Sequence, residues 1–102
     1  MAVGDFLNAP DVDEIDASAY TGAVGDPIVV RAHDDVEVTG VVVTLTDATG
    51  TVLESGLAAP DEWRWRYDAQ TAVASGTTVT VTAEASDRPG NTGDASVTVT
   101  TP

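Results

Sequence analysis

The stretch Thr77-Thr78-Val79-Thr80-Val81-Thr82-Ala83-Glu84-Ala85 decides the fold, because polar and apolar side chains alternate along it. Residues 95–100, Ala-Ser-Val-Thr-Val-Thr, repeat the alternation near the end of the chain. Successive side chains of a β-strand point to opposite faces, so a period of two predicts a strand with one face in a core. Valine and threonine also lose side-chain freedom in helices. The sequence therefore predicts half-buried β-strands here.

Earlier in the chain, similar short runs are separated by glycine, proline and aspartate. We expect seven strands in all, at residues 11–16, 28–33, 41–46, 51–54, 62–67, 77–86 and 94–101. Arg31 faces water at lower cost than it faces a core, which turns Ile28 and Val30 inward. No window has the apolar spacing of an amphipathic helix. Short strands with regular turns predict an all-β sandwich, with a small barrel as the alternative.

The length of 102 residues corresponds to one domain. Residues 1–10, ending at Pro10, are predicted to be a leader or linker, and residues 11–102 to be the domain. The sequence contains no cysteine, which excludes disulfides and thiolate metal sites.

The strongly negative net charge of the chain restricts the kinds of molecule that it can bind. Seventeen carboxylates face four arginines and no lysine, which gives a formal net charge of −13. Nucleic acids and anionic membrane surfaces require a basic protein surface, so we expect neither as a partner. The apolar runs are only a few residues long, too short for a membrane-spanning helix.

Three stretches resemble bacterial immunoglobulin-like domains. They are Arg31-Ala32-His33-Asp34-Asp35 followed by Val41 to Leu45, then Glu62-Trp63-Arg64-Trp65, and lastly Val79 to Asn91 followed by Val97-Thr98-Val99-Thr100. The turn Ala85-Ser86-Asp87-Arg88-Pro89-Gly90-Asn91 is the most recognisable part. The resemblance implies an immunoglobulin-like Greek-key sandwich.

The function that this resemblance implies is that of a non-catalytic module in a larger exported protein. Such modules occur in surface and secreted bacterial proteins as spacers, adhesion segments or accessory domains. We therefore expect a monomer at the cell surface or outside the cell, whose partners are neighbouring domains and a surface protein or glycan. The alternatives are a carbohydrate-binding accessory module and a calcium-stiffened link between domains.

The aromatic run is Trp63-Arg64-Trp65-Arg66-Tyr67. On one strand its three rings share a face, and the two arginines share the other. The rings could form a platform for a sugar, but the other inward positions are mostly valine and alanine. Large aromatic side chains then supply the bulk between the sheets, so we predict that all three rings lie in the core.

Acidic residues in the predicted loops suggest a metal-binding site. In an immunoglobulin-like tracing, Asp34, Asp35, Asp87 and Asn91 come to one end of the sandwich and are candidate calcium ligands, because Ca²⁺ takes six to eight oxygen ligands. The competing interpretation is that these side chains cap their own turns. His33, the only histidine, could join Asp34 and Asp35 as a metal ligand or simply point outward at a strand end.

Catalysis has little support in the sequence. There is no cysteine or lysine nucleophile, and no serine lies in a nucleophile-elbow motif. A small sandwich also offers no deep apolar pocket of the kind that active sites use. We therefore expect no enzymatic activity.

The charge predicts a salt response. Added NaCl screens repulsion among the carboxylates, with a Debye length of about 10 Å at 0.1 M and about 3 Å at 1 M, so the free energy of unfolding should rise with salt. Urea denaturation from low to molar NaCl measures this. A midpoint that does not move would contradict the prediction.

Overall fold

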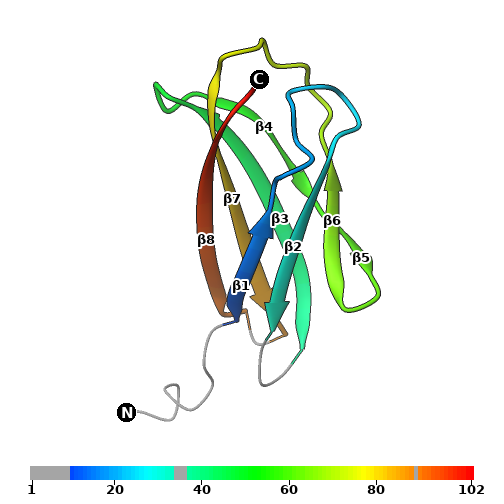
Figure 1. The fold of residues 1–102 in the computed structure, drawn as a ribbon. Helices are drawn as coiled ribbons and strands as arrows, with labels where there is room; N and C mark the ends of the chain where they lie inside the picture. The colour runs from blue at the N-terminus through cyan, green and yellow to red at the C-terminus, as the bar shows by residue number, and fades with distance from the viewer. Residues whose placement is uncertain (1–9, 34–36, 89) are drawn as a thin grey trace.

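The chain folds into β-strands joined by turns (Figure 1). The computed structural model describes residues 10–33, 37–88 and 90–102. In these ranges there are eight strands: β1 (Asp11–Asp16), β2 (Pro27–His33), β3 (Val38–Asp47), β4 (Val52–Leu57), β5 (Ala59–Asp61), β6 (Arg64–Asp68), β7 (Thr78–Asp87) and β8 (Thr92–Thr100). Among the residues described, no helix has the length and apolar character needed to cross a membrane.

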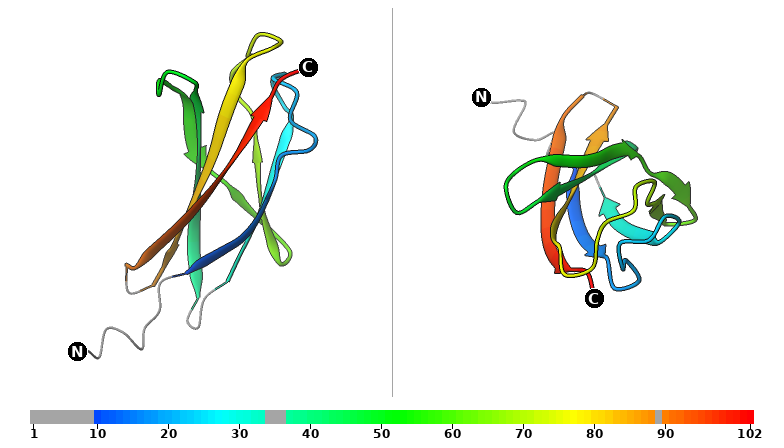
Figure 2. Two further views of the ribbon diagram at one scale, coloured as in Figure 1. Left: turned by 60° about the vertical axis from the view of Figure 1, so that its left-hand side comes forward. Right: turned by 90° about the horizontal axis from the view of Figure 1, so that it is seen from above.

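The strands form two antiparallel sheets that pack face to face (Figure 2). One sheet has the order β1-β2-β6-β5, and the other has the order β4-β3-β7-β8. These orders correspond to strands A-B-E-D and C-F-G of an immunoglobulin-type sandwich, with β4 added beside strand C. The predicted all-β sandwich is confirmed, and the barrel is excluded because the sheets are separate. The strand that the sequence did not reveal is β5, a three-residue strand that contains Pro60.

The inward-facing residues of the alternating strands in both sheets form the core. The fully buried side chains on the strands are Ile28 and Val30 on β2, Val41, Val43 and Leu45 on β3, and Val79, Val81, Ala83 and Ala85 on β7. Along β8, Val97 and Val99 are half-buried and pack against this cluster. Arg31 is exposed, as the predicted phase of β2 requires.

A β-bulge sets the phase of β1. Val12 pairs with Ala32 and Glu14 pairs with Arg31, so Asp13 is an extra residue in the ladder. A regular strand would send Val12 and Ile15 to opposite faces, because side chains alternate. With the bulge, both side chains are half-buried against the core. The neighbouring carboxylates of β1 are then all exposed to solvent.

The aromatic strand differs from the prediction. Tyr67 is buried and Trp65 is half-buried against the core, as expected. Trp63, however, is 59% exposed, so its predicted place in the core is wrong. The strand begins only at Arg64, because Glu62 and Trp63 form the two-residue turn between β5 and β6. Glu62 has a positive φ of 58°, which redirects the chain and breaks the alternation.

Tyr67 joins the two sheets at the side where β4 and β6 face each other. Its hydroxyl donates a hydrogen bond to a Glu54 carboxylate oxygen. The same carboxylate accepts hydrogen bonds from the backbone N–H groups of Gln70, at 2.8 Å, and Thr71, at 3.0 Å. Gly56 leaves room for the ring, because a Cβ there would lie 2.9 Å from the Tyr67 Cε1 atom. A charged residue of one sheet thus holds a strand and a loop of the other.

The second buried tyrosine, Tyr20, has no such partner. Its hydroxyl is buried and makes no hydrogen bond with any residue that the structure describes. Burial is the main cause that raises the pKa of Tyr20 above its ordinary value, and the negative charge of Glu54 adds to the effect. Burial, followed by the hydrogen bond to Glu54, also raises the pKa of Tyr67. Both tyrosines therefore stay neutral at physiological pH.

These two tyrosines give a matched pair of stability tests. Tyr67→Phe removes a hydrogen bond to a charged group, so we expect the free energy of unfolding to fall by about 1.5–3 kcal/mol. Tyr20→Phe removes only an unsatisfied hydroxyl, so stability should stay within about 0.5 kcal/mol or increase. Urea denaturation followed by circular dichroism measures both. Equal losses in the two variants would show that Glu54 contributes nothing through Tyr67.

Candidate functional site

A depression among the described residues lies on the outer face of the β1-β2-β6-β5 sheet. It is a shallow hollow of about 180 Å³. Its lining combines carboxylates, guanidinium groups, an indole and one aliphatic side chain: Glu14 and Asp16 of β1, Val29 and Arg31 of β2, Trp63 of the turn, and Arg64 of β6. We call this the Trp63 hollow.

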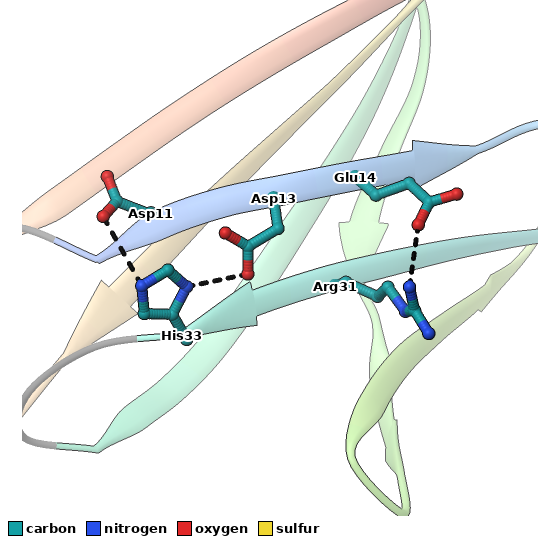
Figure 3. A network of polar contacts seen from close by, with 5 residues as sticks. All are labelled: Asp11, Asp13, Glu14, Arg31 and His33. Atoms are coloured by element: carbon teal, nitrogen blue, oxygen red, sulfur yellow. Dashed lines mark hydrogen bonds and ion pairs between the residues drawn. The ribbon is translucent and has the colours of Figure 1, made fainter.

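Trp63 is held in place by a cation–π stack. The Arg31 guanidinium lies over the indole, with its central carbon 4.2 Å from the ring centroid. Arg31 also donates a hydrogen bond of 3.0 Å to Glu14 on the neighbouring strand (Figure 3). Such stacks contribute about 0.5–1 kcal/mol at exposed sites. The stack therefore orients an indole that is largely exposed to solvent.

Arg64 differs from the other arginines in its hydrogen bonding. Arg31, Arg66 and Arg88 each donate a hydrogen bond of 3.0 Å or less to a carboxylate. The closest carboxylate to Arg64 is that of Asp61, 3.5 Å from its Nε atom. This Nε atom is buried without a hydrogen bond within the described part of the chain. The arrangement thus offers guanidinium donors beside an exposed indole, a combination suited to binding a carboxylate.

His33 lies elsewhere on the same sheet face, between two carboxylates of β1 (Figure 3). Its Nδ1 atom is 2.7 Å from an Asp13 oxygen, and its Nε2 atom is 3.7 Å from an Asp11 oxygen. The predicted outward orientation is confirmed, because the side chain is exposed. The bulge at Asp13 brings that carboxylate to the ring. Because the two carboxylates face opposite ring nitrogens, they do not converge with one nitrogen on a shared metal position.

The predicted calcium ligands are only partly described. Asp34 and Asp35 lie outside the described residues. Asp87 is buried at 4% exposure and closes the β7–β8 turn, where its Oδ1 atom accepts a 2.7 Å hydrogen bond from the Asn91 N–H. This geometry is that of an aspartate capping a turn. In the described part of the chain, no group of three or more histidine or acidic side chains could hold a metal ion.

Other loop carboxylates cap turns in the same way. Asp16 accepts hydrogen bonds from Ser18, Asp26 from Thr21, and Asp47 from Thr49. In each case the side-chain hydrogen bond is the main cause that lowers the pKa of the aspartate. The turn-capping interpretation therefore holds for these three residues.

The sequence did not reveal the Trp63 hollow. Its lining comes from three strands and one turn, and the alternation of residues 63–67 argues for a buried Trp63. The available signal was Pro60-Asp61-Glu62, since proline and two acidic residues are typical of a strand that ends in a turn.

The two tryptophans should differ in solvent access. We expect acrylamide to quench one component of the emission readily and the other weakly, because Trp63 is exposed while Trp65 packs against the core. Trp63→Phe should remove the readily quenched component, and Trp65→Phe should remove the protected one. Stern–Volmer plots test this. A wild-type protein with two equally protected indoles would contradict the exposed position of Trp63.

Comparisons with known proteins show a similarity in fold and identify no family. No family model matches the sequence, and no match is found among curated proteins. Among solved structures, the chain is similar to CopC from Methylosinus trichosporium OB3b, at 18% identity over 89% of this chain and 91% of that chain, with a TM-score of 0.63. It is also similar to part of an engineered protein, at 30% identity over 89% of this chain and 20% of that chain, with a TM-score of 0.60. The similarity to CopC shows a shared β-sandwich fold.

Proposed function

We propose that this domain is a non-catalytic immunoglobulin-like module of an exported bacterial protein, and that it serves as a load-bearing spacer for adhesion or accessory domains. The observation that carries this proposal is the position of the two ends of the domain. Pro10 precedes β1 at one end of the sandwich, and Thr101 follows β8 at the opposite end (Figure 1). Modules of this kind can be joined in a linear series, with neighbouring domains of the same polypeptide as partners.

The terminal strands also lie along the line between the two ends. β1 and β8 run in the same direction, each from the end that contains Pro10 toward the end that contains Thr101 (Figure 2). β1 is hydrogen-bonded to β2, and β8 is hydrogen-bonded to β7 over nine residue pairs without a register shift. Tension between the ends therefore acts parallel to the strands and loads the hydrogen bonds of each ladder together. A load perpendicular to the strands would open them one at a time.

Entry into β1 is fixed by a close backbone contact. Pro10 is fully buried, and its carbonyl oxygen lies where a side chain at Gly93 of β8 would start, 1.9 Å from an ideal Cβ position. The N-terminal end of β1 therefore packs directly on the backbone of the last strand. This contact joins the two strands that receive the load.

The absence of catalysis is part of the proposal. Ligand pockets of enzymes commonly enclose about 300–1,000 Å³, whereas the Trp63 hollow is smaller and lies on an open sheet face. The exported location rests on the resemblance to modules of bacterial surface proteins. The net charge of −13 supports a domain that stays monomeric and avoids nucleic acid.

A second candidate function, carbohydrate binding, is favoured by the exposed and oriented indole of Trp63. The three-ring platform does not exist, because Trp65 and Tyr67 face the core. The third candidate, a calcium-stiffened link, depends on Asp34 and Asp35, which lie outside the described residues.

Force spectroscopy tests the spacer function. In a polyprotein pulled through its termini, we expect each module to unfold in one step, with a contour-length gain on the order of 30 nm at about 3.3–3.6 Å per residue. The unfolding force should clearly exceed that of the same module pulled through Thr49 and the C-terminus, because the β3–β4 turn, which contains Thr49, lies at the same end of the sandwich as the C-terminus (Figure 1).

The chain lacks cysteine, so Thr49→Cys provides a unique attachment site for this control. The spacer proposal fails if the two pulling directions give equal forces. It also fails if the terminal pull detaches β1 at negligible force.

A further inference from the structure

We propose that the Trp63 hollow binds a single acidic sugar residue, a hexuronate, by pairing its carboxylate with Arg64 and its hydroxyl groups with Glu14 and Asp16. This inference goes beyond the spacer function and would give the module an adhesive surface toward acidic polysaccharides. It rests on four features of the hollow that lie together.

Arg64 supplies the first of these. A guanidinium group has five N–H donors, which match the two oxygens of a carboxylate in a bidentate pair. The Nε atom of Arg64 makes no hydrogen bond within the described part of the chain; the guanidinium forms a 3.5 Å ion pair with Asp61 and lies 5.5 Å from the centroid of the Trp63 ring. The other three arginines are engaged by short hydrogen bonds to carboxylates. Arg64 is thus the arginine best prepared to accept an external carboxylate.

The carboxylates of Glu14 and Asp16 are the second and third features of the hollow. The Oδ1 atom of Asp16 accepts hydrogen bonds from Ser18, and the Oε1 atom of Glu14 accepts one from Arg31. The second oxygen of each carboxylate accepts no hydrogen bond from the described residues, and both residues are exposed. Sugar hydroxyl groups are donors that these oxygens can accept. The same negative charges oppose a ligand that is purely anionic, such as phosphate or a polyglutamate chain.

The fourth feature is the apolar surface formed by Val29 and Trp63. Val29 lies on β2 between β1 and β6, paired with Asp16 on one side and Arg66 on the other. It contributes the aliphatic part of the lining, and the exposed indole of Trp63 contributes the aromatic part. The C–H groups of a pyranose ring can pack against both. A hexuronate therefore matches a guanidinium, two acceptor oxygens and an apolar surface at once, and the hollow has room for little more than one small ring.

A titration followed by NMR tests the proposal. The two indole N–H signals are assigned with Trp63→Phe and followed while trigalacturonate, neutral galactotriose or hexaglutamate is added to the 102-residue chain at low salt. We expect trigalacturonate to shift the Trp63 signal in a saturable way and to leave the Trp65 signal in place. Galactotriose and hexaglutamate should bind at least about tenfold more weakly, because each lacks one part of the match.

Two arginine variants give the matched comparison. Arg64→Gln should weaken trigalacturonate binding about tenfold or more. Arg66→Gln, on the same strand and the same face but outside the hollow, should change it less than about twofold. Thermal unfolding by circular dichroism confirms that both variants fold.

Three results would overturn the proposal. They are no saturable shift with trigalacturonate, equal binding of galactotriose or hexaglutamate, and equal effects of the two arginine variants. Hexaglutamate binding would assign the hollow to an acidic protein partner instead. None of these results bears on the spacer function, because the pulling experiment does not involve the hollow.

Discussion

The contact between Tyr67 and Glu54 ties the two sheets together where β4 and β6 face each other. The buried side chains of the core are mostly valine and alanine, which are much smaller than tyrosine. Tyr67 fills the space only because Gly56 has no side chain, and its hydroxyl reaches a carboxylate on the opposite sheet. This carboxylate also binds the backbone that follows β6. The contact therefore holds the end of β6 and the loop after it against β4, while the ladders with β2 and β5 hold the rest of the strand.

Two local irregularities then shape the sheet face that carries the Trp63 hollow. The bulge at Asp13 turns both apolar residues of β1 inward and leaves consecutive carboxylates outward. The positive φ of Glu62 ends β5 and places Trp63 over the outer face. A left-handed conformation costs a residue other than glycine about 1–2 kcal/mol. Both features disturb a regular sheet, and both supply side chains that line the Trp63 hollow.

Alternation predicted the regular strands well because their side chains obey a strict period of two. The inward residues of β2 and the core positions of β7 follow directly from it. The same rule misplaced Trp63, since a two-residue turn shifts the phase, and the turn signal in Pro60-Asp61-Glu62 does not say at which residue the next strand begins. The rule also could not predict the contact between Asp13 and His33, because this contact depends on a β-bulge. Sequence periodicity describes continuous ladders, whereas the candidate site is assembled where ladders are interrupted.

The large excess of carboxylates over arginines determines how each arginine side chain is paired. In a chain with seventeen carboxylates, an arginine is expected to pair with a neighbouring acid, and three of the four arginines do so through hydrogen bonds of 3.0 Å or less. Arg64 is paired more loosely, since its ion pair with Asp61 measures 3.5 Å, and its guanidinium lies 5.5 Å from the centroid of the Trp63 ring. The surrounding negative field repels free anions at long range and is shortened by salt. An anionic ligand would therefore bind here only if it also offered donors to Glu14 and Asp16, which makes hydroxyl groups as important to recognition as the carboxylate itself.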